Sequence, residues 1–295
     1  MQVLHKPVMC QEVLGYLLLQ EGDIILDATI GLGGHAREIL SKITPGGRLI
    51  GVDHDKDALK IACENLKTYI NDIELVHGDF RNLDKILKKL NLNKVDGMLF
   101  DLGVSSFQLD NPERGFSFQV DGPLDMRMDK TNYISAYDLV NNLTEKELAL
   151  ILETFGQERF HNRIAHYLVE ERKNSPIETT KELSRIILRA IGRHSYQKIH
   201  PATRSFQALR IAVNRELEAL SEGLGKSIDF LRSGSRICVI SFHSLEDRIV
   251  KTVFKDLANK GILKIITKKP VRANFSETKD NPRSRSAKLR VAERL

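Results

Sequence analysis

The sequence has no tryptophan, few cysteines and no long apolar run. Its three cysteines, Cys10, Cys63 and Cys238, lie far apart and form no Cys-x-x-Cys pair. This spacing argues against a disulfide framework and against a structural zinc site, so we expect no metal. Unpaired cysteines are typical of a reducing compartment, and we therefore expect a cytoplasmic protein.

Aromatic residues make up only 6% of the chain, which argues against a broad platform of aromatic rings for stacking bases. Residues 1–20 contain no basic leader followed by an apolar run, so no signal peptide is expected. No segment approaches the roughly 20 apolar residues that spanning a bilayer requires, so we expect no membrane partner.

Positive charge is concentrated in two stretches. Residues 260–295 contain eleven Lys or Arg and three acids, a net of +8, although the whole chain carries only +6. Residues 183–215 contain no acid and seven basic side chains, namely Arg185, Arg189, Arg193, Lys198, Arg204, Arg210 and Arg215. Clustered cations favour a phosphate partner, because each cation that meets a phosphate releases condensed counterions. The alternative interpretation is a solvated basic face.

The first hundred residues alternate short apolar runs with helical patterns, which is typical of βαβ units on a parallel sheet. The predicted strands are 24–27, 48–53, 73–77 and a central 95–102, with helices starting at 36 and covering 57–69 and 83–90. A fifth strand is predicted at 236–241, and residues 263–267 and 289–291 are candidate edge strands.

Between these regions the strand pattern stops. Residues 106–201 contain a Gly- and Pro-punctuated loop and helical patterns at 144–155, 158–171 and 180–191, the first with a capping box of Thr144 and Glu147. Further helices are predicted near 203–220, 227–231 and 245–258. The simplest architecture is a doubly wound α/β domain of residues 1–107 and 202–295, interrupted by a helical insert at 108–201.

Four predicted strands end in groups that suit a ligand. The loop after the first strand carries Gly33 and Gly34, where backbone can approach a ligand closely at a helix N-terminus. Asp53 ends the second strand, where a carboxylate can accept both ribose hydroxyls. Phe80 follows the third strand, where its ring can pack on an adenine, and Asp101 ends the fourth. Parallel strands release such groups at one sheet edge, so they predict a cofactor site.

Simpler interpretations exist for parts of this pattern. The glycines could form only a tight turn, and Asp53 could only cap the next helix. A nicotinamide-binding site is the more specific alternative. Two features argue against it: residues 31–36 read G-x-G-G-x-A instead of G-x-G-x-x-G, and no acid or base for hydride transfer follows. Asp27 opens the loop, and its carboxylate suits a cationic sulfonium or an amino group better than a pyrophosphate.

Longer strings of sequence are more specific than any of these motifs. They are residues 101–106 (DLGVSS), 108–110 (QLD), 113–117 (ERGFS), 124–129 (LDMRMD), 206–214 (FQALRIAVN), 241–248 (SFHSLEDR) and 285–290 (RSAKLR). Together they resemble the MraW family of bacterial methyltransferases, which act on the 4-amino group of a cytidine in small-subunit ribosomal RNA. The strings span nearly the whole chain.

The resemblance implies a class I, Rossmann-like methyltransferase sheet with a helical insert. It further implies S-adenosylmethionine as the methyl donor and a cytidine in the decoding region of 16S rRNA, within the small ribosomal subunit, as the acceptor. It implies cofactor contacts at Gly33, Gly34, His35, Asp53, Phe80, Asp101 and Gln108. Of these, Gln108 rests on the family alone.

The cytosine amine is a poor nucleophile because its lone pair is delocalised into the ring. An acceptor that grips one N–H would localise the lone pair and could then take the proton. Many amino methyltransferases place Asn or Asp before Pro-Pro and an aromatic residue at the fourth strand end, whereas this chain has Asp101 before Leu-Gly. We hypothesise that Asp101, Ser105 or Ser106 accepts the proton.

We also hypothesise that His243 or Asp247, after the fifth strand, helps hold the base. The simpler interpretations are a histidine packed in a turn, an Asp101 that contacts only the cofactor, and a structural Asp125–Arg127 ion pair in place of a substrate clamp. A different class of function also fits the sequence, namely an RNA-binding ribosome assembly factor that kept the fold without catalysis.

Overall fold

The computed structural model describes residues 7–192 and 200–295. Contacts within the chain divide it into two compact units. Unit 1 comprises residues 1–103 and 217–295, and unit 2 comprises residues 104–216. The predicted insert, 108–201, falls inside the range of unit 2.

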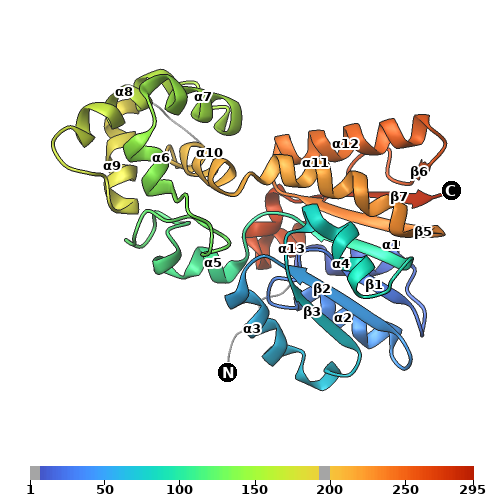
Figure 1. Ribbon diagram of the computed structural model, residues 1–295. Coiled ribbons are helices and arrows are strands. Elements are labelled where there is room, and N and C mark those ends of the chain that lie inside the picture. The colour runs from blue at the N-terminus through green and yellow to red at the C-terminus, as the bar shows by residue number, and fades with distance from the viewer. Residues whose placement is uncertain (1–6, 193–199) are drawn as a thin grey trace. The chain divides into compact units, whose positions relative to one another are not determined.

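Unit 1 is built on a seven-stranded sheet with the order β3-β2-β1-β4-β5-β7-β6 (Figure 1). The strands are β1 (Ile24–Asp27), β2 (Arg48–Asp53), β3 (Ile73–His77), β4 (Val95–Asp101), β5 (Leu231–Ser241), β6 (Leu263–Ile265) and β7 (Lys288–Arg294). The first five strands pair in parallel, and β7 runs antiparallel to both of its neighbours. This arrangement confirms the predicted Rossmann-like α/β class, with β4 in the centre of the sheet.

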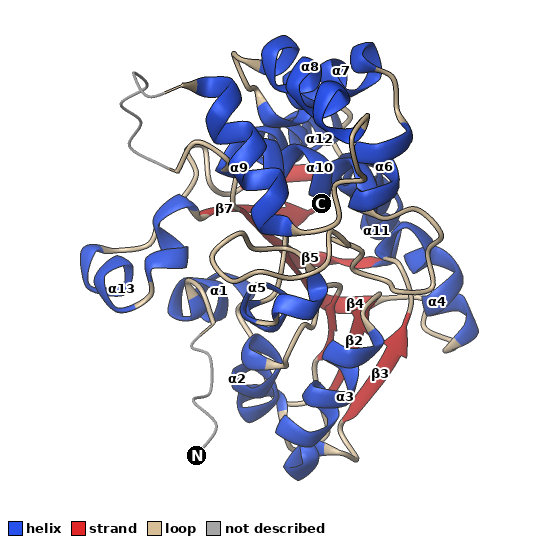
Figure 2. Ribbon diagram, turned by 90° about the vertical axis from the view of Figure 1, so that its left-hand side faces the viewer, coloured by secondary structure: helices blue, strands red, loops and turns tan. Residues whose placement is uncertain are grey.

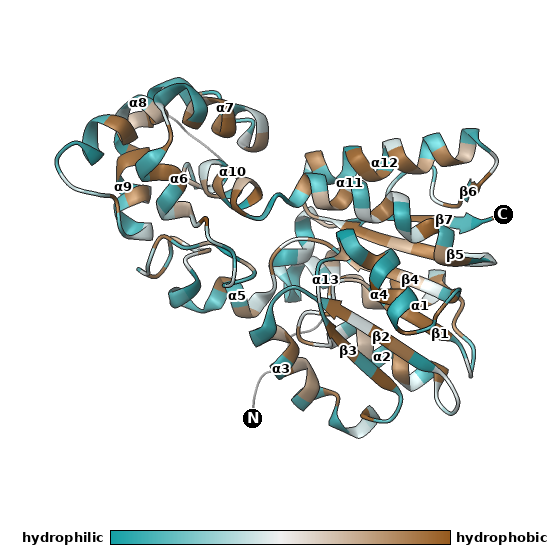
Figure 3. Cartoon of the chain, in the orientation of Figure 1, coloured by the Kyte–Doolittle hydropathy of each residue, from teal (hydrophilic) through white to brown (hydrophobic). Residues whose placement is uncertain are grey.

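Helices cover both faces of this sheet. The helices α1 (Cys10–Leu17), α2 (Gly34–Ile43) and α3 (Lys56–Asn65) share one apolar cluster, and α4 (Leu83–Lys89), α11 (Glu216–Ser227) and α12 (Ser244–Asn259) share another. Successive strand residues enter opposite clusters, as Leu49 and Ile50 do, because side chains alternate across a strand. The central strands, such as β1 and β2, are therefore apolar along most of their length (Figure 3).

The last part of unit 1 leads into β7. A short helix, α13 (Phe275–Asp280), is followed by a 3-10 helix at Pro282–Ser286. The carboxylate of Glu277 accepts a hydrogen bond from the backbone N–H of Met9 at 2.7 Å, so α13 lies beside the start of α1 (Figure 2).

Unit 2 is helical. It contains α5 (Ser106–Asp110), α6 (Ala136–Asn142), α7 (Glu145–Gly156), α8 (His161–Arg172), α9 (Thr180–Ile191) and α10 (Thr203–Asn214). Within its described residues no strand occurs, only an isolated bridge between Pro123 and Thr179. The helices enclose a separate apolar core, and the predicted Thr144–Glu147 capping box is present at the start of α7.

Three details of the predicted elements were wrong. Residues 203–220 are not one helix, because Arg215 adopts a left-handed conformation with φ of 51° and separates α10 from α11. Residues 289–291 are not an edge strand, since β7 lies between β5 and β6, and on that side of the sheet β6 is the edge strand. The fifth strand begins at Leu231, five residues earlier than predicted, because its start pairs with Val95 of β4.

Among the described residues no helix is both long enough and apolar enough to cross a membrane.

Candidate active site

The glycine loop between β1 and α2 has a backbone shape that favours glycine. Gly31 and Gly33 have φ of +52° and +83°, a region that L side chains rarely adopt. A Cβ on Gly33 would also lie 2.7 Å from the Leu66 side chain. The glycines do form a tight turn, and the turn also positions the start of α2, whose first N–H groups have no partner within the helix.

Asp53 holds this loop instead of capping the next helix. Its carboxylate accepts hydrogen bonds from the backbone N–H of Gly31 and of Asp55, each at 2.9 Å. The N-cap of α3 is Asp55, so the capping interpretation of Asp53 was wrong. Burial raises the pKa of Asp53, and the two backbone hydrogen bonds oppose that rise.

Three ionisable groups lie close together beside the loop, two of them buried and the third, Asp101, half-buried. His35 Nε2 is 3.5 Å from the carboxylate of Asp101, and Asp27 is close enough to interact electrostatically with both. His35 and Asp27 are only 6% and 1% exposed. Burial raises the pKa of Asp27 to about 7, against the opposing effect of His35.

The charge of His35 follows from the same cluster. Burial alone would lower its pKa, but Asp101, then Cys10 and Asp27, outweigh burial and raise the pKa to about 10. The acidic neighbours therefore favour the protonated form of His35. The backbone N–H of Asp101 is fixed by a 2.6 Å hydrogen bond to the Thr29 hydroxyl.

This cluster suits a cationic group. The Oδ1 atom of Asp101 is buried and, among the described residues, accepts no hydrogen bond. Such an atom costs free energy unless a ligand donates to it. Asp27, Asp53 and Asp101 bring three carboxyl groups to one sheet edge beside a single histidine, so a ligand that donates hydrogen bonds or carries a positive charge, such as an amino or sulfonium group, is complementary.

Phe80 lies at the end of β3 in a restrained position. Its ring meets Phe100 edge to face with centroids 5.8 Å apart, and it is half-buried. A Cβ on Gly223 would lie 2.6 Å from the ring, so glycine in α11 makes room for it. The ring is thus held rigidly at the edge where an adenine was predicted to pack.

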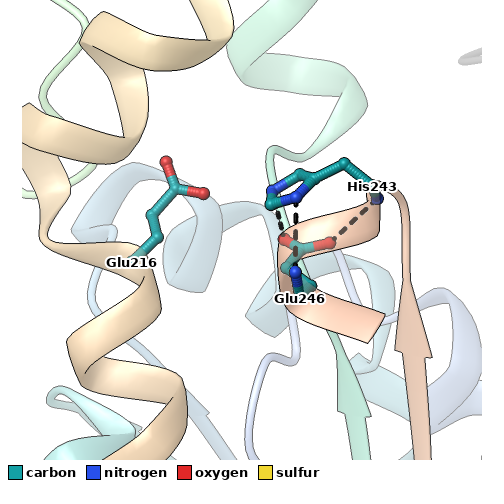
Figure 4. Close-up of side chains that lie close together, drawn as sticks. All are labelled: Glu216, His243 and Glu246. Carbon is teal, nitrogen blue, oxygen red and sulfur yellow. Dashed lines mark hydrogen bonds and ion pairs between the residues drawn. The ribbon is translucent and has the colours of Figure 1, made fainter. Parts of the chain in front are cut away.

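His243 is the N-cap of α12 (Figure 4). Its Nδ1 accepts from the N–H of Glu246 at 3.4 Å, and the buried carboxylate of Glu246 accepts from the N–H of Phe242 at 2.7 Å. Asp247 is engaged elsewhere, by Lys288 at 3.0 Å and Arg290 at 2.6 Å. Those two contacts lower the pKa of Asp247 against the effect of burial. Asp247 therefore ties α12 to β7, while His243 Nε2 lies 3.2 Å from the carboxylate of Glu246.

The remaining predicted residues belong to unit 2. Ser105 caps α5, accepting from the N–H of Gln108 at 3.2 Å, while Gln108 Oε1 accepts from the N–H of Ser105 at 3.0 Å. Gln108 is buried, and Ser106 is half-buried at the first position of the helix. The capping box orients the side chains of Ser105 and Gln108 locally.

In unit 2, several of the sequence strings that carry the family resemblance are linked to one another by hydrogen bonds. Arg114, 1% exposed, donates to the carbonyls of Arg127 and Met128 at 3.0 and 2.9 Å. The amide of Asn214 binds the backbone of Met128 at 2.8 Å. Arg127 pairs with Asp125 at 2.8 Å, which is the structural ion pair considered above. These contacts give strings 113–117, 124–129 and 206–214 a common structural role.

Some cations of the predicted basic stretches form ion pairs within the protein. Arg189 pairs with Glu171 at 2.8 Å, and Arg210 pairs with Glu216 at 2.8 Å in a largely buried bridge. Arg193 and Lys198 lie outside the described residues. Phosphate contacts are therefore expected from fewer cations than the sequence stretches contain.

Unit 1 thus holds the predicted cofactor residues except Gln108. It brings together Asp27, His35 and Asp101, and it links Asp53 to the glycine loop. Asp27 was noted in the sequence but was not predicted to contact the cofactor. An acid at a strand end before a glycine loop was the signal that could have predicted this role. Thr29 and Glu246 were missed, because their roles depend on hydrogen bonds between segments distant in sequence or on cap geometry.

Comparison with known proteins gives a consistent result. The family model described as "MraW methylase family" matches residues 2–295. Proteins named "Ribosomal RNA small subunit methyltransferase H" from Halothermothrix orenii and Geotalea uraniireducens are 48% and 49% identical, each over 99% of this chain and 98% of the relative. The protein of that name from Caldicellulosiruptor saccharolyticus is 48% identical over 99% of both chains.

Proposed function

Because the chain belongs to the MraW methylase family, we propose that it transfers a methyl group from S-adenosylmethionine to the 4-amino group of a cytidine in the decoding region of 16S rRNA. The observation that carries the cofactor assignment is the buried cluster of Asp27, His35 and Asp101 beside the glycine loop. When bound, S-adenosylmethionine supplies an electrophilic methyl group on a sulfonium.

We assign cofactor binding to the carboxyl edge of unit 1. The N-terminus of α2 at Gly33, Gly34 and His35 offers N–H groups, and Asp53 offers acceptor positions beyond its two backbone bonds. Phe80 offers a rigid ring. The family resemblance adds Gln108 from unit 2.

The acceptor amine needs alignment and a place for its proton. Alignment is the larger demand, because methyl transfer is an in-line displacement. Asp101, Ser105 and Ser106 are the candidate proton acceptors, and Asp101 has an unused buried oxygen that supports its choice. His243 is the candidate for holding the base.

The substrate RNA is expected to meet the helical unit and the exposed cations. A target cytidine in structured RNA would have to leave its stack, since a paired or stacked amine cannot reach a buried methyl donor. We propose that unit 2 contributes recognition of the RNA, and that the reaction takes place in the cytoplasm, which the three free cysteines favour.

The decisive experiment has two parts. The purified protein is incubated with tritiated S-adenosylmethionine and small ribosomal subunits, and the labelled nucleotide is located by mass mapping. The expected result is that label enters a single cytidine of the decoding region. In rRNA from cells that lack the protein, the same cytidine should carry no methyl group. A protein that binds rRNA without binding the methyl donor would instead be an assembly factor.

A further inference from the structure

Phe275 is a large aromatic side chain that the fold leaves in solvent. It is 84% exposed at the first position of α13, in a chain with few aromatic residues. A single exposed apolar residue is common on protein surfaces. Its significance therefore depends on its surroundings.

The surroundings of Phe275 in the chain are strongly basic. Residues 268–286 contain six Lys or Arg and two acids. Five of these cations make no ion pair or hydrogen bond to the described residues, namely Lys268, Lys269, Arg272, Lys279 and Arg285, and all five are exposed. One of the two acids, Glu277, is already bound to the backbone of Met9. The segment thus offers cations that the protein itself does not neutralise.

The topology brings this segment to the edge of the sheet that holds the candidate active site. Lys288, the first residue of β7, pairs with Ser241 at the carboxyl end of β5, and the neighbouring Ile240 pairs with Asp101. The 3-10 helix before β7 therefore lies at the same edge as Asp101. Ser284 in that helix is buried, and its hydroxyl donates to the carbonyl of Asn281 at 2.8 Å.

A second link connects α13 to the site. Glu277 holds the N–H of Met9, and the next residue, Cys10, is one of the groups that acts on His35. Phe275 is two residues before Glu277. An RNA strand bound along this segment would therefore run close to the buried carboxylate cluster of unit 1.

We propose that residues 268–286 form a docking surface for single-stranded RNA, in which Phe275 stacks on an unpaired base and the exposed cations contact the flanking phosphates. This inference rests on the proposed function and deepens it. An exposed ring among unpaired cations is the combination that binds single strands, since every base has a face for stacking and every linkage a phosphate. A duplex hides its base faces. A protein partner would instead require a contiguous apolar patch, and Phe275 is flanked by polar Asn274 and Ser276.

Binding of a fluorescent single-stranded RNA of about 12 nucleotides tests the stacking contact. Phe275→Ala is expected to weaken binding about ten-fold, Phe275→Trp to retain it, and Phe275→Leu to behave like the alanine variant. The matched control is Ile70→Ala, which removes a side chain 54% exposed near the opposite, amino edge of the sheet. Thermal unfolding of each variant verifies its fold.

The charge contribution is tested with two double variants. Lys268→Ala/Lys269→Ala should flatten the plot of log affinity against log salt by about 1.4 units, the value for two phosphate contacts on a single strand. The control is Lys88→Ala/Lys89→Ala, which removes two exposed cations from the last turn of α4, ahead of the amino end of β4.

Unchanged RNA binding by Phe275→Ala, or full binding by Phe275→Leu, would overturn the stacking proposal. Unchanged binding of the RNA together with reduced methylation of assembled subunits would also overturn it, in favour of a ribosomal protein as the partner. Methylation of subunits by the wild-type protein is measured in parallel. Its absence would reject the proposed function itself, whereas normal wild-type methylation with an unaffected Phe275→Ala would reject only the docking surface.

Discussion

At the carboxyl edge of unit 1, some residues are needed for the backbone structure and others are available for chemistry. Gly33 is required by its backbone conformation, and Asp53 is required by the loop that it fastens. Asp101 differs from both, because its Oδ1 atom is buried without a hydrogen-bond partner among the described residues. Asp101 is therefore the residue at which a chemical role can best be separated from a structural one.

Replacing Asp101 should separate binding from chemistry. If Asp101 takes the amine proton, Asp101→Asn should reduce the methyl-transfer rate at saturating cofactor by about 100-fold. The affinity for S-adenosylmethionine, measured by calorimetry, should fall less. Asp101→Ala and Ser105→Ala, measured in the same way, compare the candidate acceptors. A normal rate for Asp101→Ala at saturation would leave Asp101 with a cofactor contact only.

The raised pKa of His35 predicts a pH-dependent stability. A histidine whose pKa rises from 6.5 to about 10 on folding stabilises the protein fully below pH 6.5, and this contribution disappears as the pH rises through 10. Asp27 gives the same trend at lower pH, because its raised pKa means that stability falls as the pH rises from 3.8 to about 7 and the buried carboxyl ionises.

Urea unfolding of wild type and His35→Gln without cofactor measures the first of these effects. The difference in unfolding free energy should be on the order of a few kcal/mol at pH 6 and should shrink towards pH 10. The imidazole NMR signal that is lost in His35→Gln should not titrate below pH 8. A difference that stays constant across this range would show that His35 contributes only packing.

At the scale of helices and strands, several of the candidate site residues lie at helix N-termini and cap them. Ser105 and His243 both act as N-caps, with Gln108 and Glu246 three residues later completing the two capping boxes. A cap satisfies backbone N–H groups that have no partner within the helix. Conspicuous polar residues at these positions therefore have a structural role before any catalytic one is considered.

Two substitutions at His243 distinguish these roles. His243→Ala should lower stability by about 1 kcal/mol because the cap is lost, whereas His243→Ser keeps a good capping side chain and should be nearly neutral. If His243 also holds the base, both variants should lose methyl transfer to a similar extent. Tm and turnover are measured on the same samples, and full activity in His243→Ser would reduce the residue to a cap.

At the scale of the whole molecule, the charge is distributed to serve both the fold and a partner. Arg290, Lys288 and Arg210 are bound by carboxylates, so they stabilise the protein and are not available for phosphates. Lys268, Lys269 and their exposed neighbours remain. The formal net charge of +6 therefore gives a poor measure of how many cations RNA can meet.

Methyl transfer to ribosomal RNA should fall steeply with added salt. Each phosphate contact contributes a slope of about −0.7 to −0.9 in log affinity against log salt, so five contacts would give roughly −4. Rates at subsaturating RNA between 50 and 200 mM salt measure this slope, with cofactor affinity at the same salt concentrations as the control. A salt-independent rate would contradict electrostatic recognition by the exposed cations.

Local sequence was sufficient for most of the elements and for the cofactor edge. Apolar runs and capping residues predict β1 to β4 and the start of α7, because strand alternation and cap hydrogen bonds involve residues only a few positions apart. The ends of β2 and β4 then place Asp53 and Asp101 at one edge, since parallel strands share their carboxyl ends. The family resemblance extended this to the reaction and its substrate.

Only the tertiary structure decided the features that depend on pairing across the chain. The interior position of β7 follows from its hydrogen bonds to β5 and β6, and no local pattern marks it. The raised pKa of His35 arises from acidic side chains on two other segments, and the ion pairs of Asp247 arise from β7. Local propensity determines which elements form. Burial and long-range contacts determine which side chains keep a free charge or an open acceptor, and therefore which of them can act on a ligand.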